Sequence, residues 1–306
     1  MFPFAETCWF LSGPTASGKT AVGIDLARNI NAEIISLDSM AVYRIMDIGT
    51  AKPTHAERTA VPHHLIDVVD PHEEFSVAQF LDAAEKVVAE IRSRDKTPLF
   101  VGGTPMYLKA LLRGIFQGPP ADWDFRQQME QFAAEHGPDK LHTRLAQVDP
   151  LAAIKLLIQD QRRVIRALEV FEKTGKPLSE WQAQFDQGQP AVACKVFVLD
   201  WPREQLYDRI NRRVDGMFAA GLVEETQRLL TGPPLGRTAA QAVGYREVLE
   251  HLSGLRELDS TIELVKTRTR QFAKRQGTWF RGLSECRFVA VQEPLEIGGT
   301  VEQIVG

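Results

Sequence analysis

Residues 13–20 read Gly-Pro-Thr-Ala-Ser-Gly-Lys-Thr, which matches the phosphate-loop pattern G-x-x-x-x-G-K-[ST] at every fixed position. A short apolar run, Cys8–Leu11, precedes this stretch, and a helical pattern follows it to about Ile30. A strand, a glycine-containing turn and a helix, in that order, are the context in which such a loop binds phosphate. We therefore expect the fold to begin with an α/β unit that carries a phosphate-binding loop.

The residue types in this loop explain how it would hold a phosphorylated ligand. Glycines let backbone N–H groups wrap around an anion, and the N-terminus of the following helix adds partial positive charge. Lys19 would supply a mobile cation, and Thr20 a hydroxyl ligand for Mg²⁺. The alternative is a glycine-rich turn that binds nothing, and the flanking strand and helix favour the phosphate site over it.

Further strands and helices alternate along the first third of the chain. Glu33–Leu37 and Pro98–Val101 are apolar runs of strand length, and Ser76–Gln79 is typical of a capping box that opens an amphipathic helix. Strands that alternate with helices predict a parallel sheet with helices on both faces. The expected fold class is α/β, with a P-loop NTPase-like parallel sheet core.

Two other strand ends should face the phosphate loop, because ligands of open α/β sheets bind outside the carboxyl ends of the strands. One strand leads into Asp38 and Ser39, and the other leads into Gly102-Gly103-Thr104. A carboxylate at this edge could accept a proton or bind Mg²⁺ through water, whereas the alternative is that Asp38 caps a following helix. The strand Pro98–Val101 ends in glycine rather than aspartate, which disfavours a motor ATPase.

Residues 116–193 form a predicted helical insert. Gly118-Pro119-Pro120 is typical of a linker, and the chain from Asp122 to about Gln189 is helical in pattern without a convincing strand. Gly188-Gln189-Pro190 ends this region, and Cys194–Leu199 resumes a buried-strand pattern. The expected core is therefore discontinuous, built from residues 1–115 and 194–306, and an all-helical domain interrupts it.

The composition limits the classes of protein that the chain could be. At 306 residues, 44% hydrophobic and 25% charged, it has the apolar surface for a globular core. No apolar run approaches the roughly 20 residues of a membrane span, and three separated cysteines indicate neither a disulfide framework nor a zinc site. Because the N-terminus lacks the pattern of a secretory signal, we expect a cytoplasmic protein.

Charge is distributed unevenly along the chain. The net charge of −4 gives the whole chain no attraction for nucleic acid, yet residues 264–282 carry six basic side chains and no acid. Such a run could bind phosphates, or it could be a solvated helix face.

Motifs beyond the phosphate loop resemble one enzyme family in an order that runs from residue 11 to residue 281. The blocks are Asp38–Arg44, Met46–Pro53, Pro62–Asp67, Gly102–Thr104 with Tyr107-Leu108, Arg209–Asn211 with Arg213-Val214, Gly221–Glu225, Val243–Arg246, and Ala273–Gln276 with Thr278–Arg281. Together they resemble the tRNA dimethylallyltransferase (tRNA isopentenyltransferase) family. Composition and spacing alone indicate no more than a phosphate-loop enzyme with a helical insert.

The resemblance implies transfer of a dimethylallyl group from dimethylallyl diphosphate to N6 of the adenosine immediately 3′ of the anticodon in certain tRNAs, with release of diphosphate. An exocyclic amine is a poor nucleophile, so the site must neutralise the leaving diphosphate and accept a proton. The implied catalytic residues are Asp38 as the base, Thr104 at the bridging oxygen, and Lys19. The implied diphosphate-binding residues are Gly13, Thr15, Ala16, Ser17, Gly18, Lys19, Thr20 and Arg213, with Mg²⁺ as the cofactor at Thr20.

The resemblance also implies tRNA-binding residues in the core and in the insert. They are Asp38, Ser39, Met40, Ala41, Thr104, Arg126, Arg162, Arg163, Val164, Ile165, Arg166, Gln241, Ala242, Val243, Gly244, Tyr245 and Arg246. Arg162 and Arg166 are four residues apart and share a helix face, so the insert is expected to contact the anticodon stem. The expected partners are tRNA and dimethylallyl diphosphate, with no membrane, and the chain is expected to act as a monomer. His63 and His64 are expected to be structural rather than metal ligands.

Three alternatives remain open. A small-molecule kinase would share the phosphate loop and the fold class, but not the insert or the motif series. An enzyme acting on free adenine nucleotides would not need an insert that contacts an anticodon stem. A catalytically impaired tRNA-binding paralogue would not need to keep Lys19, Asp38 and Thr104, although Ala41 and Gln241 stand where the family commonly has other residues.

Overall fold

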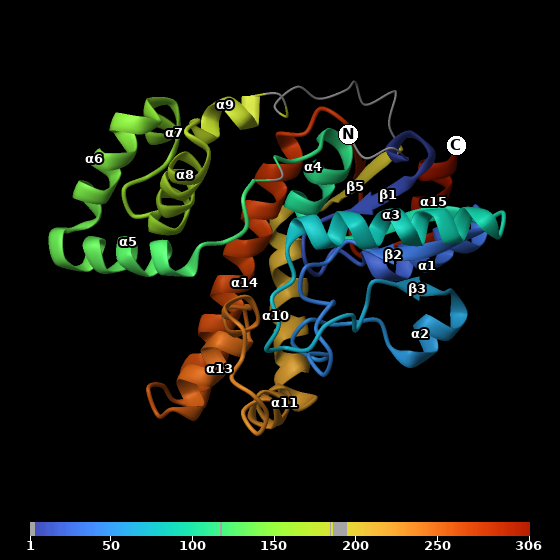
Figure 1. Ribbon diagram of the computed structural model, residues 1–306. Helices are drawn as coiled ribbons and strands as arrows, with labels where there is room; N and C mark the ends of the chain where they lie inside the picture. The colour runs from blue at the N-terminus through green and yellow to red at the C-terminus, as the bar shows by residue number, and fades with distance from the viewer. Residues whose placement is uncertain (1–3, 117, 184, 186–194) are drawn as a thin grey trace. The chain divides into compact units, whose positions relative to one another are not determined.

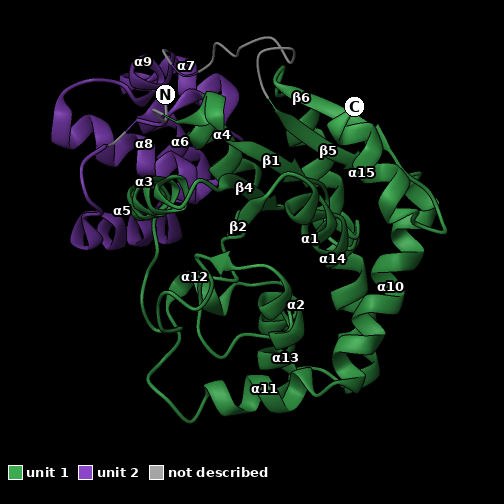
Figure 2. Cartoon of the chain, turned by 90° about the vertical axis from the view of Figure 1, so that its right-hand side faces the viewer, with its two compact units in different colours: residues 1–112, 189–306 green, residues 113–188 purple. Residues whose placement is uncertain are grey.

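The computed structural model describes residues 4–116, 118–183, 185 and 195–306. The chain divides into two compact units, Met1–Leu112 with Gln189–Gly306 (unit 1) and Arg113–Gly188 (unit 2), which are coloured separately in Figure 2. The expected core and insert correspond to units 1 and 2, with slightly different limits. Residues 188–190 and Cys194, which were expected to end the insert and to begin the next strand, lie outside the described residues.

Unit 1 is built on a parallel sheet whose strands, in the part of the chain that the structure describes, lie in the order β3-β2-β4-β1-β5-β6. The strands are β1 (Trp9–Ser12), β2 (Ala32–Ser36), β3 (His63–His64), β4 (Thr97–Gly102), β5 (Val196–Asp200) and β6 (Cys286–Ala290). In the central pairings Leu11 of β1 lies opposite Val101 of β4 and Phe197 of β5. The strands predicted near residues 8–11, 33–37, 98–101 and 194–199 are β1, β2, β4 and β5, and the parallel α/β class is confirmed.

Helices cover both faces of this sheet (Figure 1). Successive residues of a strand point to opposite faces, so Leu11 packs with α1, α10 and α15, whereas its neighbour Phe10 packs with α3 and α4. Helix α14 contributes Val265 to the first cluster and Phe280 to the second. The helices of unit 1 are α1 (Lys19–Asn29), α2 (His55–Ala60), α3 (Val77–Ser93), α4 (Pro105–Arg113), α10 (Arg203–Ala219), α11 (Leu222–Leu229), α12 (Arg237–Ala240), α13 (Tyr245–Leu252), α14 (Leu258–Arg281) and α15 (Ile297–Val305).

The capping box predicted at the start of α3 is confirmed. The Ser76 hydroxyl accepts from the Gln79 N–H at 3.2 Å, and the Gln79 side chain accepts from the Ser76 N–H at 2.9 Å. Both of these N–H groups would otherwise lack a partner in the helix. The predicted apolar face of α3 is also present, because Phe80, Ala84 and Val88 are buried in the core.

A third apolar cluster lies away from the sheet and supports the loop that follows β2. Val42, Tyr43 and Met46 of this loop pack with Leu222 of α11 and Tyr245 of α13. Nonpolar burial of this kind stabilises the loop in one conformation. The polar residues that follow β2 are therefore carried by a supported segment.

Unit 2 is helical throughout its described residues, as expected for the insert. Its helices are α5 (Trp123–His136), α6 (Pro138–Val148), α7 (Pro150–Lys155), α8 (Gln161–Thr174) and α9 (Leu178–Ala183). Leu141, Leu145, Val164 and Leu168 form the centre of a separate core. Among the residues described in either unit, no helix is long and apolar enough to cross a membrane.

Candidate functional site

A cavity of about 890 Å³ lies in unit 1 at the carboxyl ends of β1, β2 and β4. The phosphate loop, the loops after β2 and β4, and the helices α10 and α14 all contribute to its lining. Among the predicted site residues, those that line it are Thr15, Ala16, Gly18, Lys19, Thr20, Asp38, Ser39, Met40, Ala41, Thr104, Arg213, Gln241, Ala242, Val243, Gly244 and Tyr245. The structure therefore brings together residues from five separate parts of the sequence.

The phosphate loop leads into an open helix N-terminus. Helix α1 begins at Lys19, directly after Gly18, whose φ of 83° lies in the left-handed region that glycine adopts without strain. No side chain caps α1, and Gly18, Lys19 and Thr20 line the cavity. A helix N-terminus with unpaired N–H groups and partial positive charge is suited to bind phosphate.

Two side chains from the later part of the chain donate hydrogen bonds to backbone carbonyls of this loop. The Trp201 indole donates to the Ser17 carbonyl at 3.0 Å, and Arg209 Nε donates to the Ala16 carbonyl at 2.8 Å. The sequence analysis did not predict these contacts, since they join residues that are 184 and 193 positions apart and no local pattern signals them.

Two predicted diphosphate-binding residues, Gly13 and Ser17, do not line the cavity. Ser17 is fully buried, and a Cβ placed on Gly13 would approach the Ser17 hydroxyl to 2.8 Å. Both residues therefore shape the loop from within, and the contact with the diphosphate predicted for them is one that backbone atoms would have to make.

Two cations meet in the cavity without an acidic partner. Within the described ranges, neither Lys19 nor Arg213 forms an ion pair, and the Lys19 ammonium donates to the Pro14 carbonyl at 3.2 Å. Removal from water and the nearby Arg213 lower the pKa of Lys19 to about 8, against the opposing influence of Asp38. Burial lowers the pKa of Arg213 as well. Two cations whose burial disfavours their charge, and which form no ion pair, indicate a site for an anion.

The neighbouring arginines of α10 already share one acidic partner. Arg209 and Arg212 both bind the carboxylate of Glu293, at 2.9 and 2.7 Å. These ion pairs lower the pKa of Glu293 and hold the segment before α15 against α10. Lys19 and Arg213 are therefore the cations best placed to receive a diphosphate.

Asp38 and Thr104 lie beside each other at the ends of β2 and β4. The Thr104 hydroxyl accepts from the Ser39 N–H at 3.0 Å, and one Asp38 carboxylate oxygen accepts from the Met40 N–H at 2.8 Å. Asp38 thus caps a turn rather than a helix, and its side chain still lines the cavity. The local role and the catalytic role that the sequence left as alternatives are compatible.

His63 and His64 form β3, and both make hydrogen bonds within unit 1. His63 Nδ1 lies 2.7 Å from the Val61 carbonyl, and His64 Nε2 lies 2.7 Å from Glu33, which Arg94 also binds. These contacts are of the kind expected from the structural role that the sequence analysis predicted, and His63 also lines the cavity.

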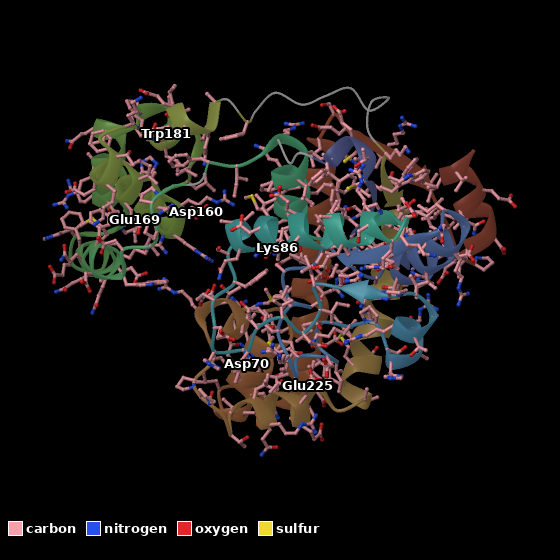
Figure 3. All side chains as sticks on the ribbon, turned by 45° about the vertical axis from the view of Figure 1, so that its right-hand side comes forward. Asp70, Lys86, Asp160, Glu169, Trp181 and Glu225 are labelled. Atoms are coloured by element: carbon pink, nitrogen blue, oxygen red, sulfur yellow. The ribbon has the colours of Figure 1, made fainter. Side chains whose placement is uncertain are left out.

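The sequence analysis missed the role of Glu225, which lies on α11 (Figure 3). Its buried carboxylate accepts from the N–H groups of Asp47, Ile48 and Gly49 at 3.1, 2.9 and 3.2 Å and from the Tyr245 hydroxyl at 2.6 Å. A signal was present, because Glu225 lies at helical spacing between Leu222 and Leu229 on the apolar face. An acid at such a position indicates a buried hydrogen-bond network.

Of the predicted tRNA-binding residues 241–246, the last does not lie with the others. Residues 241–245 line the cavity, where the fully buried Tyr245 contributes ring surface while its hydroxyl is bound to Glu225. Arg246 does not line the cavity, and its guanidinium donates to Glu247 at 3.1 Å. The structure therefore separates Arg246 from the residues with which it was predicted.

In unit 2 the predicted stretch 162–166 has two kinds of side chain. Arg162 and Arg163 are exposed, whereas Val164 and Ile165 are buried in the core of the unit. The expectation that Val164 and Ile165 contact tRNA is wrong for their side chains, because they face the helices of the same unit.

Arg126 and Arg166 both bind the fully buried carboxylate of Glu169, which lies among the helices of unit 2 (Figure 3). Arg126 makes two hydrogen bonds to it, at 2.9 and 2.8 Å. These interactions lower the pKa of Glu169, although burial acts in the opposite direction. Removing one partner of a buried charge is costly, so these two arginines have a structural role.

Most basic side chains of α14 also have partners on other elements. Lys266 binds Asp215 at 2.8 Å, Arg268 binds Glu247, and Arg281 binds Asp200 at 3.3 Å. Lys274 and Arg275 are exposed, and neither forms an ion pair within the described ranges. The basic surface expected along residues 264–282 is therefore reduced to the neighbourhood of these two.

Comparison with known proteins gives this arrangement a family. A family model described as IPP transferase matches residues 41–283. The chain belongs to the IPP transferase family. A tRNA dimethylallyltransferase from Rhodopirellula baltica is 49% identical to it over 93% of this chain and 88% of the relative. Another, from Geobacter metallireducens, is 44% identical over 97% of this chain and 96% of the relative.

Solved structures are similar to this IPP transferase family member over nearly its whole length. The full-length tRNA isopentenylpyrophosphate transferase from Bacillus halodurans has a TM-score of 0.69 and 39% sequence identity, with 98% of both chains covered. A eukaryotic dimethylallyltransferase described as acting on tRNA has a TM-score of 0.76 and 29% identity, with 97% of this chain and 77% of that chain covered. The P-loop NTPase-like core and the resemblance identified from the motifs are thus confirmed.

Proposed function

We propose that this IPP transferase family member moves a dimethylallyl group from dimethylallyl diphosphate to N6 of the adenosine immediately 3′ of the anticodon in tRNA. The observation that carries the proposal is the meeting of Lys19 and Arg213, two cations without an acidic partner, with Asp38 and Thr104 in one cavity. The transfer requires cations that stabilise an anionic leaving group and a group that accepts the proton lost from N6.

Each cavity residue then has a chemical role. The bond between the allylic carbon and the bridging oxygen breaks, and the diphosphate leaves with the electron pair. Lys19, Arg213 and the N-terminus of α1 stabilise its negative charge. A bond forms between the same carbon and N6, and the N6 proton passes to the Asp38 carboxylate. Thr104, at the end of β4, would donate its hydroxyl hydrogen to the leaving oxygen.

Mg²⁺ is part of the proposal. The Thr20 hydroxyl lines the cavity and has no hydrogen-bond partner among the described residues, and a hydroxyl oxygen is a ligand that Mg²⁺ accepts. When bound, the ion would neutralise part of the charge of the diphosphate. We propose Thr20 as its protein ligand.

Recognition of tRNA would combine the cavity with exposed cations. The target base must leave its stack to reach Asp38, which costs a few kcal/mol. Arg162 and Arg163 in unit 2, and Lys274 and Arg275 in unit 1, are exposed side chains that could bind phosphates and offset that cost. We further propose that the protein acts in the cytoplasm as a monomer, since one chain supplies every residue of the cavity.

The testing experiment offers labelled dimethylallyl diphosphate with four acceptors: tRNA, an anticodon stem-loop, AMP and ATP. We expect transfer to tRNA, weaker transfer to the stem-loop, and no product from AMP or ATP. Lys19→Ala is the matched control, and it should abolish transfer while tRNA affinity stays within a few-fold of wild type. Efficient prenylation of AMP would favour the free-nucleotide enzyme, and no transfer to any acceptor would favour the kinase or the impaired paralogue.

A further inference from the structure

We propose that Gln276 is a positioning residue for the transfer, which holds the phosphate loop and Thr104 at a fixed separation; this inference rests on the proposed function. Gln276 lies on α14 and is 4% exposed. Its Oε1 accepts from the Thr15 N–H at 2.9 Å, and its Nε2 donates to the Gly103 carbonyl at 2.6 Å. One buried amide therefore joins the loop after β1 to the loop after β4.

The two partners require a side chain that both donates and accepts, as an amide does at any pH. The Thr15 N–H can only donate and the Gly103 carbonyl can only accept, so the side chain between them must offer one acceptor and one donor. An ionised carboxylate accepts but does not donate, and a hydrocarbon does neither. The same partners fix which end of the amide is oxygen and which is nitrogen.

The contact with Gly103 determines where Thr104 lies. The Gly103 carbonyl and the Thr104 N–H belong to one planar peptide unit. Gln276 holds the carbonyl side, and the Thr104 N–H donates to the Leu37 carbonyl at 3.1 Å on the other side. The Thr104 hydroxyl, which accepts from the Ser39 N–H, is thus carried on a peptide plane that is fixed from both sides.

The amide also lies close to the cation that would meet the leaving group. A Cβ placed on Gly103 would lie 2.7 Å from Gln276 Nε2 and 3.4 Å from Lys19 Nζ, so both groups pack against the same small residue. A side chain at position 103 would displace them, and the close approach needs a glycine. Gln276 therefore holds the Thr104 hydroxyl at a fixed position relative to Lys19 and the phosphate loop.

The consequence concerns the rate of transfer more than the binding of either substrate. A displacement of about 1 Å in a reacting group can lower a rate by about 10²-fold. Gln276 is buried against the two loops and is not one of the exposed cations proposed to bind tRNA. Its loss should therefore lower turnover while tRNA affinity stays nearly constant.

The first test replaces the amide by a side chain of similar length with no hydrogen-bonding capacity. We expect Gln276→Met to lower kcat for transfer to tRNA by about 10²-fold, with the KM for dimethylallyl diphosphate and the Kd for tRNA within a few-fold of wild type. Gln271→Met is the matched control, because Gln271 is exposed on the same helix. Melting curves of both variants establish that they are folded.

The second test uses a side chain whose ability to donate a hydrogen bond to Gly103 depends on pH. In Gln276→Glu a protonated carboxyl can donate to Gly103 and accept from Thr15, whereas the ionised form cannot donate. The ratio of variant to wild-type kcat should therefore rise by about tenfold or more between pH 8 and pH 5.5. Lys19, the charged group beside the amide, has a pKa of about 8, and a carboxylate at position 276 would raise it, so Lys19 stays protonated over most of this range and the rise at low pH reports the new carboxyl. Gln276→Met and Gln271→Glu should show ratios that do not change with pH.

Two outcomes overturn the inference: wild-type kcat in Gln276→Met, or a pH-independent ratio for Gln276→Glu. Should Gln276→Met fail to fold, the pH ratio of Gln276→Glu decides alone. A wild-type protein that transfers nothing to tRNA contradicts the proposed function and this inference with it. Normal wild-type transfer with unaffected variants contradicts the inference alone.

Discussion

Lys19 has to be charged to bind a diphosphate, yet its surroundings favour the neutral amine. Loss of contact with water and the nearby Arg213 lower its pKa to about 8, and Asp38 only partly opposes them. An anion in the cavity would add an opposite charge and raise this pKa. The lysine of the empty site therefore loses its proton at a lower pH than the lysine of the occupied site.

The first prediction follows from that difference in pKa. Affinity for inorganic diphosphate should be highest below pH 8 and fall as the pH rises through about 8, and binding at pH 8–9 should take up a proton. Titration calorimetry in two buffers of different ionisation enthalpy measures this uptake. Lys19→Arg is the control, because its guanidinium stays charged and so reports only the titration of the ligand. Identical pH dependence in the two proteins would contradict the assignment.

The second prediction concerns Asp38. Asp38→Asn keeps an oxygen that can accept from the Met40 N–H, so the turn should survive, but it removes the carboxylate. Turnover should fall by about 10²–10⁴, the usual contribution of a positioned general base. Steady-state kinetics with saturating tRNA, together with diphosphate binding by calorimetry, test it. If diphosphate affinity collapses and turnover at saturation does not, Asp38 belongs to the Mg²⁺ site.

Local pattern predicted that the residues proposed to react would lie together, whereas the family resemblance implied their roles. The phosphate loop has a fixed spacing, and Asp38 and Thr104 directly follow apolar strands that end at one edge of the sheet. Gln276 and Trp201 escaped prediction as supports of the loop, since their contacts cross 261 and 184 positions of sequence. A polar residue on an apolar helix face was the one local sign of such a contact.

At the scale of single elements, helix α8 carries two kinds of arginine. Arg162 is exposed, whereas Arg166 binds the buried Glu169 and donates to the Pro119 carbonyl at 3.0 Å. Spacing correctly placed both residues on one helix, but it could not show that Glu169, a buried acid three residues after Arg166, would bind that arginine. Substitutions at the two positions should therefore have different effects.

The third prediction separates these effects. Arg162→Ala should flatten the log–log dependence of tRNA affinity on salt by about 0.7–0.9, as expected for one lost phosphate contact. Arg166→Ala should instead destabilise unit 2 by about 1–3 kcal/mol, because Glu169 is buried and loses a hydrogen-bonded partner. Filter binding over a range of salt concentrations and thermal unfolding provide the two measurements. An unchanged slope in Arg162→Ala would mean that this part of α8 does not meet the nucleic acid.

Element prediction succeeded where periodicity was long or burial complete. Helix α3 had both a capping box and a repeated apolar face, and β1, β2, β4 and β5 were apolar runs. Strand β3 has two residues, which is too few for any period, and β6 alternates irregularly because two consecutive residues are exposed. Both lie at the edges of the sheet, where burial constrains the sequence least.

At the scale of the whole molecule, the cavity lies in unit 1, and unit 2 has a helical core of its own. Every residue that lines the cavity lies in unit 1, and the core of unit 2 is formed by residues of unit 2 alone. The linker signal at residues 118–120 predicted this division closely. The sequence did not reveal the roles of two buried acids. Glu225 in unit 1 accepts from the N–H groups of residues 47–49, and Glu169 in unit 2 binds Arg126 and Arg166.

The fourth prediction uses this division. Replacement of residues 120–190 by a short linker should abolish transfer to tRNA, because the exposed Arg162 and Arg163 are removed with the insert. Binding of inorganic diphosphate should persist, since Lys19, Thr20 and Arg213 remain. Transfer assays and calorimetry on the shortened protein test both halves. Wild-type transfer to tRNA by the shortened protein would show that unit 2 has another purpose.

The discontinuity of unit 1 has a consequence for the order in which a nascent chain can fold. When synthesis has passed residue 188, unit 2 has all of its sequence, but β1 still lacks its neighbour β5 and is the open edge of a partial sheet β3-β2-β4-β1. The phosphate loop leaves the ribosome well before its supports Trp201, Arg209 and Gln276 are made. Ribosome-bound chains should therefore carry a folded helical unit beside an incomplete sheet whose apolar edge needs protection from aggregation.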